Sequence, residues 1–128
     1  MLQIQTVLGK IPAHTLGATD AHTHLFRSAG PLVDSDTEFL LDSVDYAVQE
    51  LQLYRDAGGS AVVEVTPCAP GRNADALGRI SETSGIHVVA TTGFVDWALY
   101  PGGQLWLESA SIEELAALLV AETREGMD

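Results

Sequence analysis

Two histidines one residue apart, His22 and His24, are the residues best suited to chemistry in this sequence. They lie in the segment TDAHTHLF at positions 19–26, with Asp20 two residues before the first. On a β-strand, side chains two residues apart point to the same face, so the three groups would share one face. Imidazole is the commonest neutral ligand of zinc and similar ions, and two imidazoles supply half of a tetrahedral shell. The spacing therefore predicts a metal site.

A second interpretation of the pair requires no metal. Two histidines at the end of a strand can simply form hydrogen bonds or face solvent. The spacing, the strand end and the nearby carboxylate together favour the metal site. The other two histidines are assigned no role, because His14 lies in an N-terminal segment and His87 opens a later strand at the opposite end of the sheet.

The pattern of apolar residues indicates alternating strands and helices after a short N-terminal segment, which could form a hairpin around Gly9-Lys10. Strands are expected where apolar or β-branched residues run without interruption, and helices where they recur every three or four positions. The expected strands are 16–25, 60–66 and 86–93, and the expected helices are 43–59, 73–85 and 111–126. The segments 27–42 and 94–109 are expected to be loops.

The last expected helix is clearly marked at its start, where Ser111 and Glu114 have the spacing of a capping box. Its apolar residues recur at helical spacing and predict one stripe along the helix. The stripe consists of Ile112, Leu115, Leu118 and Leu119.

This order of elements predicts an α/β fold with a parallel sheet covered by helices. Right-handed crossovers then give either an open doubly wound sheet or part of a barrel. In both architectures ligands bind at the C-terminal ends of the strands, which is where the histidine pair is expected.

Length and charge narrow the functional classes. A chain of 128 residues is expected to form one domain. The net charge of −12 and the lack of a basic cluster argue against nucleic acid as a partner.

No apolar run approaches the roughly 20 residues that cross a bilayer, and the N-terminus lacks a signal-peptide pattern. We therefore expect no membrane association and a cytoplasmic location. The single Cys68 excludes an intrachain disulfide.

Aromatic residues concentrate in the expected loop after the third strand. Phe94 and Trp97 are candidates for the apolar wall of a substrate pocket, with Tyr100 and Trp106 beside them. The alternative, that these rings only pack the loop onto helices, has equal weight.

Three charged residues are left without a role. Arg72 and Asp75 lie in GRNAD, where a capped helix start with a solvated or ion-paired arginine explains them. Glu64 could point toward the metal or be a structural partner for a backbone amide. No residue is assigned a catalytic role.

The segment TDAHTHL resembles the first-strand Asp-x-His-x-His signature of the amidohydrolase superfamily, metal hydrolases built on a (β/α)8 barrel. Longer stretches resemble the start of phosphotriesterase-family proteins. These are TVLGKIPAHTLGATDAHTHL, GGSAVVEVTPCAPGRNADALGRISETSGIHVVATTGF and SIEELAALLVAETREGMD. The resemblance implies that residues 1–128 are the N-terminal part of a single metal-dependent hydrolase barrel domain, namely its first three βα units.

The resemblance also implies that His22 and His24 bind one of two divalent ions, with zinc as the expected metal. In that family the other ligands come from later strands and include a carboxylated lysine, two histidines and an aspartate. Here Lys10 is the only lysine and no histidine follows His87. A complete barrel needs about 250 residues. We therefore expect a fragment that is inactive alone, from an enzyme that attacks its substrate with a metal-activated hydroxide.

The substrate is left open by three departures from the family pattern. Thr23 stands where glutamate is common, Glu64 where aspartate is, and Val95 in place of an aromatic residue. A small-molecule phosphotriester, lactone or related ester would suit the expected chemistry.

Two alternatives are kept. A TatD-type metal-dependent deoxyribonuclease also begins with His-x-His, but the acidic charge counts against it. A non-enzymatic interaction module could pair with another chain through an open strand edge, and a homo-oligomer is compatible with the sequence.

Overall fold

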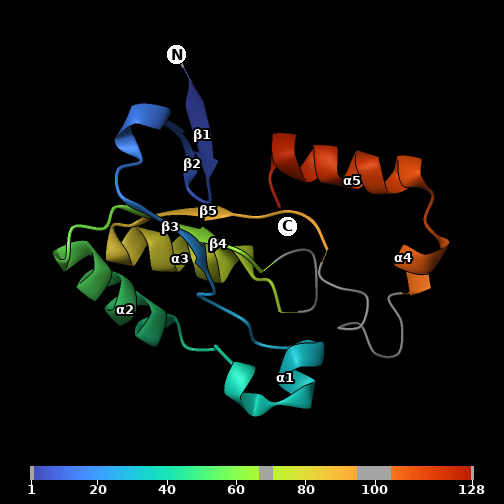
Figure 1. The fold of residues 1–128 in the computed structure, drawn as a ribbon, viewed down its shortest axis with the longest axis horizontal. Helices are drawn as coiled ribbons and strands as arrows, with labels where there is room; N and C mark the ends of the chain where they lie inside the picture. Colours follow the sequence, from blue (N-terminus) through green and yellow to red (C-terminus); the bar gives the residue numbers. More distant parts are fainter. Residues whose placement is uncertain (1, 67–70, 95–104, 128) are drawn as a thin grey trace.

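The computed structural model describes residues 2–66, 71–94 and 105–127 (Figure 1). The strands are β1 (Gln3–Thr6), β2 (Gly9–Pro12), β3 (Thr19–Thr23), β4 (Ala61–Glu64) and β5 (His87–Ala90). The helices are α1 (Pro31–Ser35), α2 (Val44–Asp56), α3 (Ala74–Ser84), α4 (Leu105–Ser109) and α5 (Ile112–Glu125). Two 3-10 turns, η1 (Ala13–Thr15) and η2 (Thr37–Phe39), complete the described elements.

The main sheet is parallel, with strand order β3-β4-β5, which confirms the predicted α/β arrangement. The antiparallel β1–β2 hairpin stands against β5, where the Val7 amide donates to the Val88 carbonyl oxygen at 2.9 Å (Figure 1). On β3, Asp20 pairs with Val62 and Thr23 pairs with Glu64. Three steps on β3 therefore match two on β4, which is the signature of a bulge within the histidine segment.

Each of the three longer helices begins at a side-chain cap, two of which, Asn73 and Ser111, were expected from the sequence. Ser43 accepts a hydrogen bond from the Tyr46 amide at the start of α2, and Asn73 accepts one from the Ala76 amide at the start of α3. Such side chains satisfy amide groups that have no partner within the helix. The capping box predicted at the start of α5 is present.

Helices α2 and α3 run side by side along the sheet and bury one continuous core (Figure 1). Leu25 and Phe26, the two residues that follow His24, are each 8% exposed and belong to this core. Their burial anchors the end of the histidine segment. The other core residues are Ala47, Val48, Leu51, Val62, Ala76, Leu77, Ile80, Ile86 and Val88.

The two expected loops contain short helices that the sequence pattern does not reveal. In 27–42 the chain forms α1 and η2, and in 94–109 it forms α4. A five-residue helix is too short to show an apolar period; α1 instead starts with a proline in its first turn, a position that suits this residue.

The predicted apolar stripe of α5 is not part of the described core. Ile112 is 80% exposed, and the buried residue of this helix is Glu122. The other three residues of the stripe, Leu115, Leu118 and Leu119, are half-buried, and the described polar contacts of α5 with other elements lie near its C-terminal end, at Glu122.

Candidate metal centre

His22 and His24 lie together at the C-terminal end of β3. Their ring centroids are 5.8 Å apart and their planes are nearly perpendicular, so both imidazoles occupy the same region. The carboxylate of Asp20, two residues before His22, accepts a hydrogen bond from the His22 amide at 3.1 Å. The strand end therefore presents two imidazoles, with the carboxylate engaged by the backbone.

Glu64, the last residue of the neighbouring strand, is fully buried beside the pair. One carboxylate oxygen accepts from the Thr66 hydroxyl at 2.6 Å and from the Leu25 amide at 3.4 Å, and the other accepts from the Thr66 amide at 3.1 Å. Burial raises the pKa of the Glu64 carboxyl, while these hydrogen bonds act in the opposite direction. Glu64 thus ties the chain after His24 to the end of β4, the structural role that the sequence left open.

The His24 ring is half-enclosed by three polar neighbours. Its Nδ1 atom lies 2.9 Å from Arg27 Nη2, 3.0 Å from Thr66 Oγ1 and 3.9 Å from a Glu64 oxygen. The pKa of His24 is lowered, first by burial and then by the positive charge of Arg27 and the proximity of His22. A lowered pKa favours neutral imidazole, the form that binds a metal.

The donor set fits two ligands of a metal centre. Two imidazoles on one strand end suit zinc, which takes histidine nitrogen at about 2.0–2.1 Å. Within residues 2–66, 71–94 and 105–127, no third histidine, cysteine, aspartate or glutamate joins them in a group that could hold an ion. If an ion is bound here, the described part of the chain would supply two of its ligands.

The remaining predicted residues have different outcomes. Phe94 follows β5 at the same edge of the sheet and is half-buried, whereas Trp97 lies outside the described residues. His14 is exposed in η1 and His87 opens β5 at the opposite end of the sheet from the His22–His24 pair.

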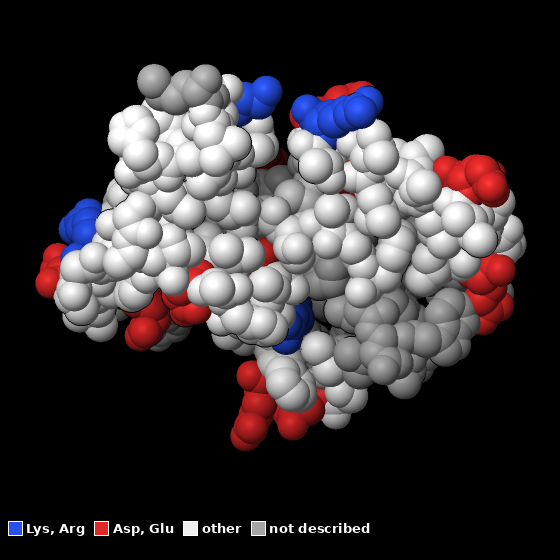
Figure 2. Space-filling model, turned by 45° about the horizontal axis from the view of Figure 1, so that its top comes forward, with Lys and Arg blue, Asp and Glu red and all other residues white. Residues whose placement is uncertain are grey.

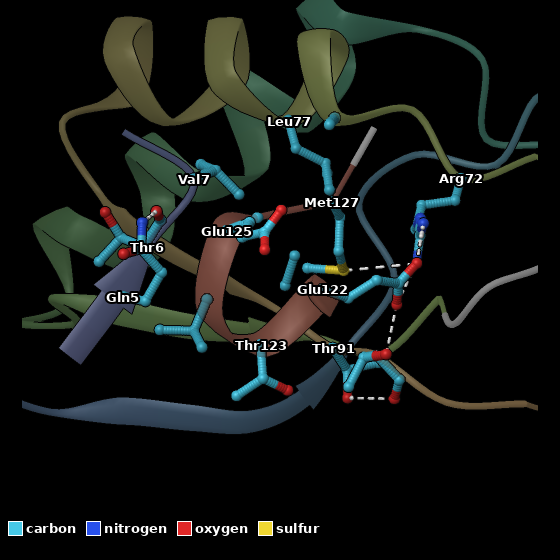
Figure 3. Close-up of a pocket in the computed structure, with 15 residues that line it drawn as sticks. Gln5, Thr6, Val7, Arg72, Leu77, Thr91, Glu122, Thr123, Glu125 and Met127 are labelled. Atoms are coloured by element: carbon cyan, nitrogen blue, oxygen red, sulfur yellow. Dashed lines mark hydrogen bonds and ion pairs between the residues drawn. The ribbon is translucent and has the colours of Figure 1, made fainter. Parts of the chain in front are cut away.

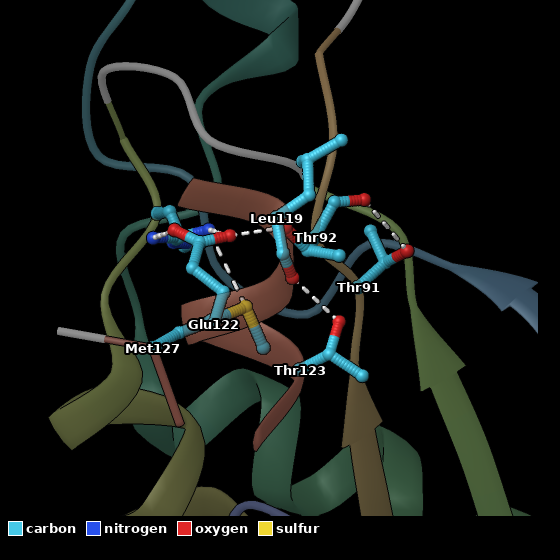
Figure 4. Close-up of polar contacts among 7 residues, drawn as sticks. Thr91, Thr92, Leu119, Glu122, Thr123 and Met127 are labelled. Carbon is cyan, nitrogen blue, oxygen red and sulfur yellow. Dashed lines mark hydrogen bonds and ion pairs between the residues drawn. The ribbon is translucent and has the colours of Figure 1, made fainter. Parts of the chain in front are cut away.

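A second polar cluster joins the start of α3 and the chain after β5 to α5, and it contains Arg72 as the ion-paired arginine that was one explanation of its sequence position. Arg72 Nη2 lies 2.7 Å from Glu122 Oε1 (Figure 3). The Thr92 hydroxyl donates to the other oxygen of Glu122 (Figure 4). Arg72 also contacts the sulfur of Met127 at 3.3 Å. The sequence contains one signal of this cluster. Glu122 lies seven residues after Leu115, or about two helical turns, and so falls on the face of α5 that carries the apolar stripe.

This second cluster forms one wall of a cavity of about 470 Å³ (Figure 3). Residues of the hairpin, α3, β5 and α5 line it, and Figure 2 shows the surface hollowed between the hairpin and α5. The lining includes Gln5, Val7, Leu77, Val89 and Thr123. The cavity lies away from the histidine pair and does not include it.

The whole chain, compared with known proteins, matches one family. The sequence profile of the Phosphotriesterase family matches residues 2–128. The chain belongs to the phosphotriesterase family. A phospho-furanose lactonase from Mycoplasmopsis agalactiae is 35% identical over 127 residues, which are 98% of this chain and 36% of the lactonase.

Solved structures agree with this membership. An amidohydrolase from Mycoplasma synoviae superposes with a TM-score of 0.89 at 35% identity, over 98% of this chain and 36% of that one. A lactonase from Listeria monocytogenes superposes with a TM-score of 0.83 at 26% identity, over 98% and 43%. This chain therefore spans between about a third and a half of these relatives, and its βα units are the N-terminal three of the family's barrel.

Membership in the phosphotriesterase family favours a hydrolase of this family over a TatD-type deoxyribonuclease, the alternative considered from the sequence. The surface agrees, because on the face in Figure 2 the basic side chains of the described residues are isolated and form no continuous band. None of the described helices is long and apolar enough to cross a membrane.

Proposed function

We propose that residues 1–128 form the N-terminal part of a single metal-dependent hydrolase domain that acts on ester-type bonds. The observation that carries the proposal is the convergence of the His22 and His24 rings at the C-terminal end of β3. In barrel enzymes this end of the strands holds the active site. Relatives named as lactonases support a lactone or related small ester as the substrate.

His22 and His24 would hold one divalent ion, most simply zinc, as part of a two-metal centre. Such a centre supplies a hydroxide at neutral pH and polarises the substrate oxygen. The contribution of this chain is to present two imidazoles on a strand whose end is fixed by Leu25, Phe26 and the buried Glu64. Phe94, at the same edge, and Trp97 would contribute to the substrate pocket.

Metal binding by single-histidine variants tests this proposal. The chain is stripped with a chelator and titrated with zinc by calorimetry, and His22→Ala and His24→Ala are expected to lose the binding. His14→Ala and His87→Ala are matched controls, since they remove the same side chain away from the pair. Equal binding by all four variants would contradict the proposed site.

Measurements of turnover test whether this chain contains a complete active site or only part of one. With two ligands in the chain, we expect the 128-residue protein to hydrolyse a lactone, a phosphotriester or a carboxylic ester at the uncatalysed rate, with or without zinc. Enzyme-like turnover by this chain with metal would show that it contains a complete site. A stable oligomer without bound metal, detected by sedimentation, would instead favour the interaction module.

A further inference from the structure

The Nδ1 atom of His24 faces two competing partners. Arg27 Nη2 lies 2.9 Å from it on one side and Thr66 Oγ1 lies 3.0 Å from it on the other. A guanidinium group has only donors, so its contact requires Nδ1 to accept and to carry no proton. In neutral imidazole the proton then sits on Nε2.

Thr66 requires the opposite tautomer. Its hydroxyl proton is directed to Glu64 Oε1 at 2.6 Å, so toward His24 the Thr66 oxygen can only accept. It is therefore satisfied by a proton on Nδ1 of His24. Glu64, Thr66 and His24 form a chain of hydrogen bonds that is complete only in the tautomer that Arg27 opposes.

The tautomer matters because a metal needs an unprotonated ring nitrogen. Histidine ligands usually donate the other ring N–H to a fixed partner, which sets the orientation and basicity of the ring. With Arg27 on Nδ1, neither nitrogen of His24 is available, since Nδ1 accepts from the guanidinium and Nε2 carries the proton. Once Arg27 withdraws, the proton can move to Nδ1 and donate to Thr66, which leaves Nε2 open.

The surroundings of Arg27 allow this exchange. Its main chain is fixed by paired hydrogen bonds with Leu41, but its guanidinium has no carboxylate oxygen within 4.0 Å among the described residues. Arg27 is 8% exposed; its guanidinium contacts the His24 ring, and its positive charge also acts on the buried Glu64 carboxyl, whose pKa it lowers. An incoming cation would repel the guanidinium.

We propose that Arg27 and Thr66 compete for Nδ1 of His24, so that Arg27 locks the ring in the form that cannot bind a metal and Thr66 is the positioning residue for the form that can. This inference rests on the proposed metal site and adds to it a control of metal loading. It assigns functions to two residues that lie next to the ligands without being ligands.

Long-range 15N NMR of the imidazole rings, recorded on the metal-free protein, tests the tautomer directly. In the unmodified chain we expect His24 to carry its proton on Nε2. Arg27→Met is expected to move the proton to Nδ1, whereas Arg27→Lys, which keeps a donor and a charge, is expected to leave it on Nε2. A proton on Nδ1 in the unmodified chain, or no change in Arg27→Met, would overturn the proposal.

Zinc titration of the same variants provides the second readout. Arg27→Met is expected to bind about tenfold more tightly, the effect of removing one competing hydrogen bond. Thr66→Val is expected to bind about 10- to 100-fold more weakly, as for other partners of metal-bound histidine, and Thr66→Ser to restore binding. Arg124→Met, which removes the same charge from an exposed site on α5, is the control and is expected to bind as the unmodified chain does.

The two readouts separate this inference from the proposed function. If His22→Ala and His24→Ala bind zinc as tightly as the unmodified chain, the metal site is wrong whatever the tautomer. If zinc binding depends on both histidines but the His24 tautomer is the same in Arg27→Met as in the unmodified chain, the metal site is supported and the proposed competition between Arg27 and Thr66 is wrong. Should Arg27→Met fail to fold, as judged by circular dichroism, Arg27→Ala replaces it in both measurements, while Thr66→Val and Thr66→Ser test the positioning role of Thr66.

Discussion

Arg72 and Glu122 form a buried ion pair that joins the start of α3 to the end of α5 across fifty residues of sequence. The nitrogen and oxygen are 2.7 Å apart, and the two side chains are 6% and 8% exposed. Two hydrogen bonds from the guanidinium reach the two oxygens of the carboxylate. Two hydrogen bonds between charged groups fix the orientation of the two side chains and make the contact stronger than a single neutral hydrogen bond.

Glu122→Gln should therefore destabilise the protein by roughly 3 to 5 kcal/mol, because the Arg72 charge stays buried opposite a neutral group. Urea denaturation followed by circular dichroism measures the change. Asp56→Asn is the control, since its pair with Arg55 spans 4.0 Å with side chains 47% and 74% exposed. An exposed pair contributes about 1 kcal/mol or less, so equal losses in the two variants would contradict the role given to the buried pair.

Gly71→Ala should disturb the loop after β3 that contains Arg27 and Ala29. Gly71 has φ +106°, and an added Cβ would collide with the Ala29 carbonyl oxygen and press on Arg27 Cγ. Gly58→Ala is a matched control, because φ is +100° there and no atom lies within 4 Å of the added carbon. Both variants carry backbone strain of about 1 kcal/mol or more, and Gly71→Ala should lose more stability than Gly58→Ala in thermal unfolding. Similar losses would show that the loop can move aside.

Tyr54→Phe should loosen the start of the parallel sheet. The Tyr54 hydroxyl reaches the carbonyl oxygens of Ala18 at 3.2 Å and Ala61 at 3.3 Å, which lie on neighbouring strands or beside them. Its loss should cost about 0.5 to 1.5 kcal/mol. Tyr46→Phe, on the same helix but 72% exposed, should change the free energy of unfolding by less.

The capping box of α5 should make stability depend on pH. Hydrogen bonds from the Ser111 amide and hydroxyl lower the pKa of Glu114. Because the pKa is lower in the folded state, the stabilisation is present above the pKa of the unfolded chain, about 4.3, and is lost as pH falls through the folded value. Glu114→Gln should thus be less stable than the unmodified protein at pH 7, with the difference shrinking in acid. Glu113→Gln removes equal charge outside the box and should not reproduce this trend.

The order of elements could be predicted from the sequence because each signal is local. Ser43, Asn73 and Ser111 precede helices as caps, and β-branched runs mark β4 and β5. The shared position of His22 and His24 follows from the period of a strand. The bulge on β3 could not be predicted in this way, since it appears only in the pairing of Asp20 and Thr23 with the next strand.

The contacts that decide the chemistry were not predictable for the same reason. Arg27 and His24 are close in sequence, but their contact depends on a turn after β3 that has no periodic pattern. Thr66 reaches the same ring from forty-two residues away. Phe94 could be placed only because the expected strand 86–93 ends next to it, although β5 itself ends at Ala90. Where a residue meets a partner from another βα unit, the local sequence contains the residue but not the partner.

All the contacts of the His24 ring described above come from residues 22 to 66, that is, from β3, β4 and the chain directly after them. Domains are synthesised from the N-terminus, and early segments can fold before later ones exist. During synthesis on the ribosome, all the residues that contact the His24 ring are made before the Arg72–Glu122 pair can form, because that pair needs α5, which is synthesised later. The imidazoles would thus be arranged early, with Arg27 shielding His24 from stray cations while the polypeptide is still growing.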